Sequence, residues 1–172
     1  MKHKQIRSEI TTGSLGLLFS TLLLLSNGVL AQEEPVQYQA IALNDTLTML
    51  IGRGGNVAIS AGSDGVYVID DQFPNIADQL LVQIRKISDQ PIRYVINTHY
   101  HGDHTGGNEA LGGSGAVIIA QDNVRQRMSA EQFNQFWNGS TPAATPASLP
   151  VITFGENVTL HLNGEAAIAY HV

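Results

Sequence analysis

The chain has no cysteine among its 172 residues. Disulfide bonds, thiolate metal sites, cysteine nucleophiles and a lipid-modified cysteine are therefore excluded within these residues. Positive charge is also sparse, with 9 Lys and Arg against 15 Asp and Glu, and no dense basic cluster is present. Nucleic acid and anionic membrane surfaces are therefore not expected as partners.

The chain instead has the composition of a soluble globular protein. Apolar residues make up 43% of it and charged residues 14%, and no segment repeats at a fixed period. A chain of this length can bury one hydrophobic core. Collagen-like, solenoid and linker-array architectures are not supported by this pattern.

The N-terminal segment has the features of a secretory signal. Basic residues precede an apolar run at residues 15–25, and small residues follow at Val29 and Ala31. The run is too short to cross about 30 Å of bilayer hydrocarbon comfortably. We expect residues 1–31 to be a Sec-type signal peptide, cleaved after Ala31, which sends residues 32–172 to the periplasm or outside the cell with no stable membrane anchor. An uncleaved anchor is the alternative.

Short strands and one helix are predicted in the first half of the chain. Residues 46–51, 56–60 and 66–70 are rich in β-branched residues at alternate positions, and the turns between them contain Gly, Ser and Asp. This pattern predicts a β-meander. Apolar residues at helical spacing predict an amphipathic helix over residues 75–88, with Asn75 as its N-cap.

Further strands and a second helix are predicted in the second half. They are strands over residues 91–98, 116–120, 151–154, 158–162 and 166–172, a helix over 121–137 capped by Asp122, and a loop over 138–150. Strands combined with helices in this order predict a mixed α/β fold. The last predicted strand runs to the end of the sequence, so we expect a domain truncated at its C-terminus.

Three of the six histidines lie in the stretch "HYHGDH", directly after a predicted strand. Alternate residues of an extended backbone point the same way, so His99 and His101 can direct both imidazoles at one point. Gly102 allows a sharp turn, after which Asp103 and His104 can serve a second centre. These ligand types suit Zn²⁺, although Fe or Mn bind them too. The stretch predicts a metal site.

The pattern His-x-His-x-Asp-His, following a β-meander, a helix and a strand, resembles the metallo-β-lactamase superfamily. The resemblance runs from about residue 46 to the last residue. It implies an α/β (α+β) fold, namely the N-terminal half of an αββα sandwich. It also implies that His99 and His101 bind one zinc ion, while Asp103 and His104 bind a second.

The resemblance also implies a mechanism. In the family a metal-bound hydroxide attacks a carbonyl or phosphoryl centre, and Asp103 would be the catalytic residue that orients this nucleophile. Two metal ions roughly 3.5 to 4 Å apart can share a hydroxide and stabilise the developing oxyanion. Asp70 would support the metal-binding loop through hydrogen bonds. The alternative interpretation makes Asp70 only a turn former at a strand end.

Three further metal ligands of the family cannot be placed in this sequence: a histidine after a strand, a bridging aspartate and a last histidine. We interpret His171 as a residue of the last predicted strand, and His161 as a residue on a sheet face, rather than as ligands. Catalytic zinc usually has three protein ligands. We therefore expect this chain to be an incomplete fragment with little activity alone.

The predicted function is that of an exported metal-dependent hydrolase acting on an ester, lactone, lactam or related bond of a small molecule. A second hypothesis is a non-catalytic periplasmic protein in which three histidines bind a single metal ion. A third is a half-domain that pairs with another chain, such as the missing C-terminal half.

Overall fold

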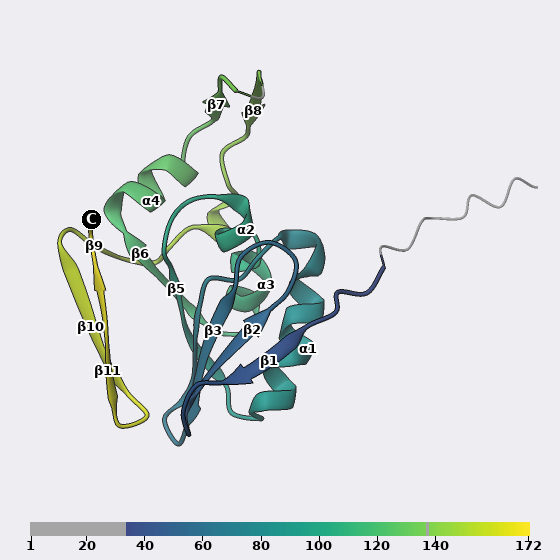
Figure 1. Ribbon diagram of the computed structural model, residues 1–172. Coiled ribbons are helices and arrows are strands. Elements are labelled where there is room, and N and C mark those ends of the chain that lie inside the picture. The colour runs from purple at the N-terminus through teal and green to yellow at the C-terminus, as the bar shows by residue number, and fades with distance from the viewer. Residues whose placement is uncertain (1–33, 137) are drawn as a thin grey trace, which may run out of the picture. The chain divides into compact units, whose positions relative to one another are not determined.

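The structure is a computed structural model that describes residues 34–136 and 138–172. The predicted signal peptide, residues 1–31, lies outside these residues. A seven-stranded sheet is the largest element (Figure 1). Its strands, in spatial order, are β1 (Gln39–Ala42), β2 (Leu47–Ile51), β3 (Val57–Gly62), β4 (Gly65–Ile69), β5 (Ile92–Asn97), β6 (Val117–Gln121) and β9 (Ile152–Phe154).

The sheet changes from antiparallel to parallel at β4. The first four strands form an antiparallel meander, of which β2 to β4 were predicted and β1 was not, whereas β5, β6 and β9 each pair parallel to their neighbours. Parallel strands have their carboxyl ends at one edge of a sheet, and ligands commonly bind there in α/β folds. Asp70 follows β4 and Thr98 follows β5, so both lie at this edge.

Helices cover one face of the sheet, which confirms the predicted mixed α/β architecture. The helices are α1 (Ala77–Ile87), α2 (Gly102–Thr105), α3 (Asn108–Gly113) and α4 (Asp122–Met128), with 3₁₀ turns η1 (Pro74–Ile76) and η2 (Pro146–Ser148). The core beneath α1 and α3 contains Leu80, Ile84 and Leu111 from the helices and Val68, Val95 and Ile118 from one row of strand residues. No helix among the described residues is long and apolar enough to cross a membrane.

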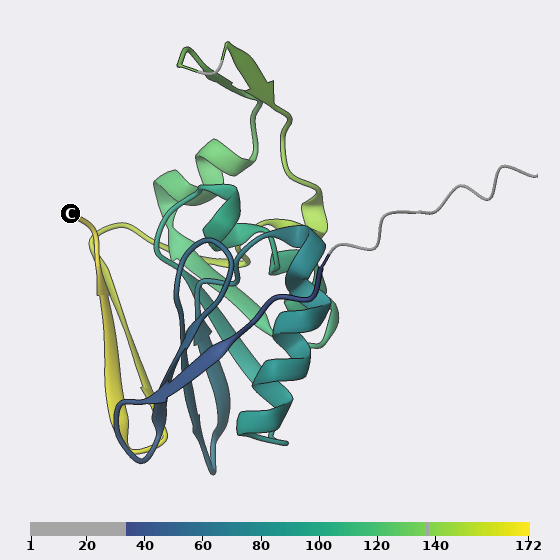
Figure 2. The same ribbon diagram turned by 45° about the vertical axis from the view of Figure 1, so that its right-hand side comes forward.

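A β-hairpin covers the opposite face. It consists of β10 (Asn157–Leu162) and β11 (Glu165–Tyr170), and Figures 1 and 2 show it across the sheet from α1. Its inward side chains, including Leu160 and Ala169, pack on Tyr67, Ile96 and Ile119. His161 lies on the exposed side of β10, which confirms its interpretation as a sheet-face residue.

The helix predicted over residues 121–137 is wrong beyond Met128. The chain continues into a two-stranded arm, β7 (Gln132–Asn134) and β8 (Gly139–Thr141), which projects from the sheet (Figures 1 and 2). Phe133 and Phe136 are 61% and 83% exposed, so no core is available to stabilise a longer helix. The Gln132 side chain donates to the carbonyls of Arg127 and Ala130 at the helix end.

Both predicted N-caps are wrong. Pro74 starts a 3₁₀ turn in which the Ala77 N–H bonds to the Pro74 carbonyl, so Asn75 already lies inside a turn. Asp122 is the first helical residue of α4, and the cap is the Gln121 side chain, which accepts from the Asn123 N–H at 2.6 Å.

His171 does not belong to the last strand, contrary to the prediction. β11 ends at Tyr170, and the His171 N–H donates to the Glu156 carbonyl at 2.8 Å. This bond joins His171 to the residue before β10, outside the regular pairing of the hairpin. The predicted strand therefore stops before the last two residues.

Candidate metal centre

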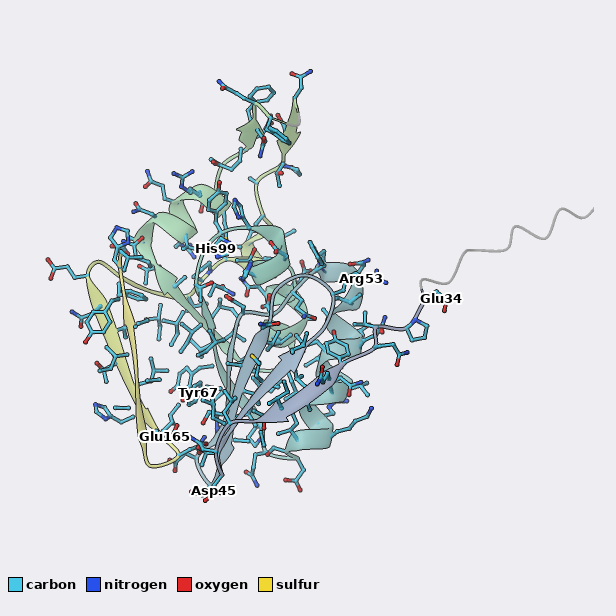
Figure 3. The ribbon with its side chains drawn as sticks, viewed as in Figure 1. Glu34, Asp45, Arg53, Tyr67, His99 and Glu165 are labelled. Atoms are coloured by element: carbon cyan, nitrogen blue, oxygen red, sulfur yellow. The ribbon has the colours of Figure 1, made fainter. Side chains whose placement is uncertain are left out.

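The histidine-rich stretch forms a tight loop after β5. Figure 3 shows His99 at the end of the sheet opposite Asp45 and Glu165. The His104 and Thr105 N–H groups both donate to the His101 carbonyl, at 3.0 and 3.1 Å, and thereby start α2. The His99 ring contacts the other two imidazoles: ring centroids lie 4.8 Å apart for His99 and His101 and 3.9 Å apart for His99 and His104.

Asp70 ties both ends of this loop to the end of β4. One of its carboxylate oxygens accepts from the Thr98 N–H at 2.8 Å. The other lies 2.8 Å from the Thr98 hydroxyl and 2.7 Å from Nδ1 of His104. Asp70 is only 5% exposed and has a φ of 61°, a left-handed conformation that Asp tolerates better than most residues. The carboxylate is thus directed at the loop rather than at solvent.

These contacts assign the tautomers of two histidines. Thr98 donates its one hydroxyl proton to Asp70, so at 3.1 Å from His99 it accepts from Nδ1–H. His104 donates its own Nδ1–H to Asp70. The hydrogen-bond network therefore leaves a lone pair on Nε2 of both rings, as a metal ligand requires.

The donor atoms lie in two pairs. His99 Nε2 is 3.1 Å from His101 Nδ1, and His104 Nε2 is 3.3 Å from Asp103 Oδ2. Zinc–nitrogen bonds of roughly 2.0 to 2.1 Å place two tetrahedral ligand atoms about 3.3 Å apart, so each pair fits one ion in chemistry and spacing. Among residues 34–136 and 138–172, no group of three or more such side chains gathers around one point. Each pair is therefore an incomplete ligand set.

The surroundings of His99 favour its neutral form. Burial lowers its pKa below the ordinary value, and the neighbouring His104 and His101 lower it further. The carboxylates of Asp70 and Asp103 oppose this shift. A neutral imidazole at neutral pH is the form that binds a metal ion.

Buried polar residues hold the backbone of the loop. The His104 carbonyl accepts from the Asp71 N–H at 3.1 Å and from the Asn97 side-chain amide at 2.9 Å. The Asn97 side chain in turn accepts from Asn108 at 3.0 Å. Asp71, Asn97 and Asn108 are at most 3% exposed. Because buried polar groups are costly when unpaired, this network favours one loop conformation.

Asp71 carries an unusual carboxyl group. One oxygen accepts from the Gly107 N–H at 2.9 Å, while the other is buried with no partner among the described residues. Burial raises the pKa of Asp71 well above its ordinary value, and the negative charge of Asp70 adds to this, although the Gly107 hydrogen bond opposes it.

Gln72 connects the loop to the turn between β2 and β3. Its side-chain amide donates to the Gly55 carbonyl at 2.7 Å and accepts from the Tyr38 hydroxyl at 2.9 Å. A Cβ atom on Gly55 would lie 2.8 Å from Cε1 of His104. Gly55 therefore lets this turn approach the His104 ring closely.

Most of these supporting residues were not predicted from the sequence. Asn97 and Asn108 flank the histidine-rich stretch in the sequence, and Asp71 is next to Asp70. These polar residues beside predicted buried strands were the signal that could have identified them. Nothing in the local pattern of Gly55 indicated contact with His104, because the turn lies far from the loop in the sequence.

Several solved structures with the same fold are metallo-β-lactamases. One from Cronobacter sakazakii with a HARLDQ motif is 23% identical, with a TM-score of 0.62 over 74% of this chain and 50% of that one. A subclass B3 enzyme of Bradyrhizobium japonicum is 21% identical, with a TM-score of 0.62 over 77% and 51%. A third from Pontibacter korlensis is 19% identical, with a TM-score of 0.56 over 76% and 58%.

At such identities the likeness shows the fold alone, and the chain spans about half the length of these structures. The sequence adds an independent match, because residues 50–165 fit the family described as the Metallo-beta-lactamase superfamily. This segment is more than half of the 172 residues and includes the loop, Asp70 and their buried supports. The chain therefore belongs to the metallo-β-lactamase superfamily.

Proposed function

We propose that this chain carries the first metal ligands of an exported zinc-dependent hydrolase that cleaves an ester, lactone, lactam or related bond. The main support is the contact of Asp70 with Thr98 and His104, which leaves Nε2 of His99 and His104 free to bind a metal ion. Membership of the superfamily and the fold shared with metallo-β-lactamases support the same reaction class.

Each donor pair has its own ion in this proposal. His99 and His101 would hold the first zinc ion, and Asp103 and His104 the second. A bound zinc ion lowers the pKa of its water to about 7 and polarises a substrate carbonyl. The Asp103 side chain is 34% exposed, so its carboxylate can accept a hydrogen bond from the attacking water and orient it.

The proposed activity belongs to the whole protein. Each donor pair provides two ligands, and catalytic zinc normally has three from the protein. The chain covers 50% to 58% of the solved structures named above. We propose that a C-terminal half supplies the remaining ligands and that residues 32–172 alone bind zinc weakly and have little activity.

Export is a separate part of the proposal, based on the charged and apolar residues before Gln32. The intact mass of the protein recovered from the cell envelope tests it. An N-terminus at Gln32 is expected. A mass that still includes residues 1–31 would contradict cleavage after Ala31.

Metal removal tests the reaction class. The whole protein should hydrolyse at least one of a chromogenic cephalosporin, an aryl ester and a lactone, lose this activity in a chelator, and regain it with zinc. Activity that survives complete metal removal would contradict the mechanism. Tight stoichiometric zinc binding without turnover of any substrate would favour the non-catalytic alternative.

Asp103→Ala in the whole protein should reduce kcat by about a hundredfold, by analogy with the loss of a key electrostatic group. Asp89→Ala is the matched control, because Asp89 is an exposed carboxylate away from the loop. A rate for the Asp103 variant close to that of the control would mean that the role of Asp103 has been misassigned.

A further inference from the structure

The turn between β2 and β3 lies against the Asp103–His104 ligand pair. A Cβ atom on Gly55 would lie 2.8 Å from Cε1 of His104, and one on Gly54 would lie 3.2 Å from Cβ of Asp103. Because glycine leaves room for so close an approach, the backbone of the turn restricts where these two side chains can lie. The positions of both ligands therefore depend on the position of the turn.

Gln72 holds the turn in this place. Its side-chain amide donates to the Gly55 carbonyl at 2.7 Å, and its backbone carbonyl accepts from the Gly106 N–H at 2.8 Å. Gln72 thus bonds the turn with its side chain and the histidine loop with its backbone. The residue is 0% exposed, so loss of its side-chain hydrogen bonds would leave buried polar groups unpaired.

Tyr38 orients the Gln72 amide. A backbone carbonyl only accepts hydrogen bonds, so the amide nitrogen must face the turn, which leaves Oε1 of Gln72 to accept from the Tyr38 hydroxyl at 2.9 Å. Burial raises the pKa of Tyr38, although the charge of Arg53 opposes this shift, so the hydroxyl keeps its proton at neutral pH. Tyr38 is itself held near α1, because the Val36 N–H donates to the Gln79 side chain at 2.8 Å.

We propose that Gln72 is a positioning residue for the Asp103–His104 pair, and that by holding the β2–β3 turn it increases the affinity of this pair for the second zinc ion. The inference rests on the proposed function, which assigns one zinc ion to each donor pair. Residues that support metal ligands commonly contribute roughly 10- to 100-fold to metal affinity. Gln72 acts through the backbone of the turn and does not touch the ion.

The other donor pair has a different support. Nδ1 of His99 lies 3.1 Å from the Thr98 hydroxyl, which is bonded to Asp70 rather than to the turn. Loss of Gln72 should therefore weaken the binding of one zinc ion and spare the other. This difference between two sites of one protein separates a positioning role from a general loss of structure.

Zinc binding tests the proposal without hydrolysis. The whole protein, freed of metal, is titrated with Zn²⁺ in competition with a chromophoric chelator, and His104→Ala identifies the binding event of the second ion. Gln72→Met keeps the length of the side chain but has no amide. It should weaken that event by about tenfold or more and change the other by less than about threefold. Equal weakening of both events, or of neither, would overturn the proposal.

A second variant moves the His104 ring directly. Gly55→Ala would place its Cβ 2.8 Å from Cε1 of His104, so the ring must shift, and the second ion should again bind about tenfold more weakly. Gly113→Ala is the matched control, because a Cβ there meets nothing within 4 Å, and it should change neither affinity. Unchanged zinc binding in Gly55→Ala would overturn the dependence of the ligand pair on the turn.

A further control separates positioning from stability. Leu80→Ala removes a buried side chain from the core and should leave the ratio of the two zinc affinities unchanged while the protein remains folded. Tyr38→Phe removes one of the two side-chain hydrogen bonds of Gln72 and should shift the same event as Gln72→Met, by a smaller factor. If Leu80→Ala altered the ratio as Gln72→Met does, lost stability would explain the effect and the proposal would be overturned.

Hydrolysis and zinc binding together distinguish this inference from the proposed function. Two bound zinc ions, a hydrolysed substrate and unchanged affinities in Gln72→Met would overturn the inference but not the hydrolase. Zinc binding that depends on Gln72, with no hydrolysis of any substrate, would overturn the hydrolase and leave the positioning role in place. Absence of zinc from the Asp103–His104 pair of the whole protein would overturn the inference, and absence from both pairs would overturn the hydrolase as well.

Discussion

The two faces of the seven-stranded sheet are covered in different ways. On the helix face, Leu80, Ile84 and Leu111 are at most 1% exposed. On the hairpin face, the inward residues of β10 and β11 are only half-buried, and exposed residues such as Ile168 alternate with them. The helix face therefore forms a closed hydrophobic core, whereas the residues of the hairpin that cover the other face are only partly buried.

The difference extends to the candidate site. Asn108 and Gly107, which hold the histidine loop through Asn97 and Asp71, lie at the start of α3 on the helix face. A cavity beside His99 is instead lined by β11 of the hairpin. Stability of the loop and the shape of the cavity beside His99 therefore depend on opposite faces of the sheet. Substitutions can separate these two contributions.

The largest effect should come from the helix face. Leu80→Ala removes a side chain with 0% exposure and should lower the free energy of unfolding by about 2 to 5 kcal/mol, because a cavity remains in a closed core. Denaturant unfolding of the whole protein measures this. Val82→Ala, on the same helix but 49% exposed, is the control and should cost far less. Equal costs would contradict the assignment of the core to this face.

The contribution of Asp71 to the stability of the fold should depend on pH. The raised pKa of Asp71 means that the folded state binds a proton which the unfolded chain releases near the ordinary value of 3.8. The stability contributed by neutral Asp71 is therefore complete below that value and is lost as the pH rises through the raised pKa. Asp71→Asn cannot ionise, and its amide oxygen can still accept from Gly107.

As the pH rises from 5 to 8, the free energy of unfolding of Asp71→Asn should therefore increase relative to that of the unmodified protein. The expected increase is about 1 kcal/mol or more, because a pKa difference of one unit between the folded and unfolded states corresponds to about 1.4 kcal/mol. Unfolding measured at both pH values in a chelator tests this. Asp89→Asn, an exposed carboxyl, should show no such trend. If the unmodified protein instead became more stable than Asp71→Asn at the higher pH, the Asp71 carboxylate would be charged and well paired in the folded state.

The smallest effect should come from the hairpin face. Leu160 is half-buried against Tyr67 and its neighbours, so Leu160→Ala should cost about 1 kcal/mol or less. Ile168→Ala, on the exposed side of β11, is the matched control and should be close to neutral. A cost for Leu160→Ala equal to that for Leu80→Ala would remove the contrast between the two faces.

Much of the fold could be predicted from the sequence because the signals were local. The meander, α1 and β5 followed from alternation, turn residues and helical spacing. The helix predicted over residues 121–137 extends too far, because Phe133 and Phe136 are exposed and bury nothing that would stabilise further helical turns. The helix α4 ends at Met128 because the residues that follow are not buried in the fold. A local stretch of sequence does not show which residues will be buried.

The sequence by itself determined the donor chemistry: three histidines and an aspartate in a glycine-containing turn after a strand. Only the tertiary structure decided how these groups are supported. Parallel pairing of β4 with β5 brings Asp70 beside Thr98, and the β2–β3 turn brings Gly55 against His104. Such contacts join residues distant in the chain, and they form only when burial of the core pays the entropy of closing the loops between them.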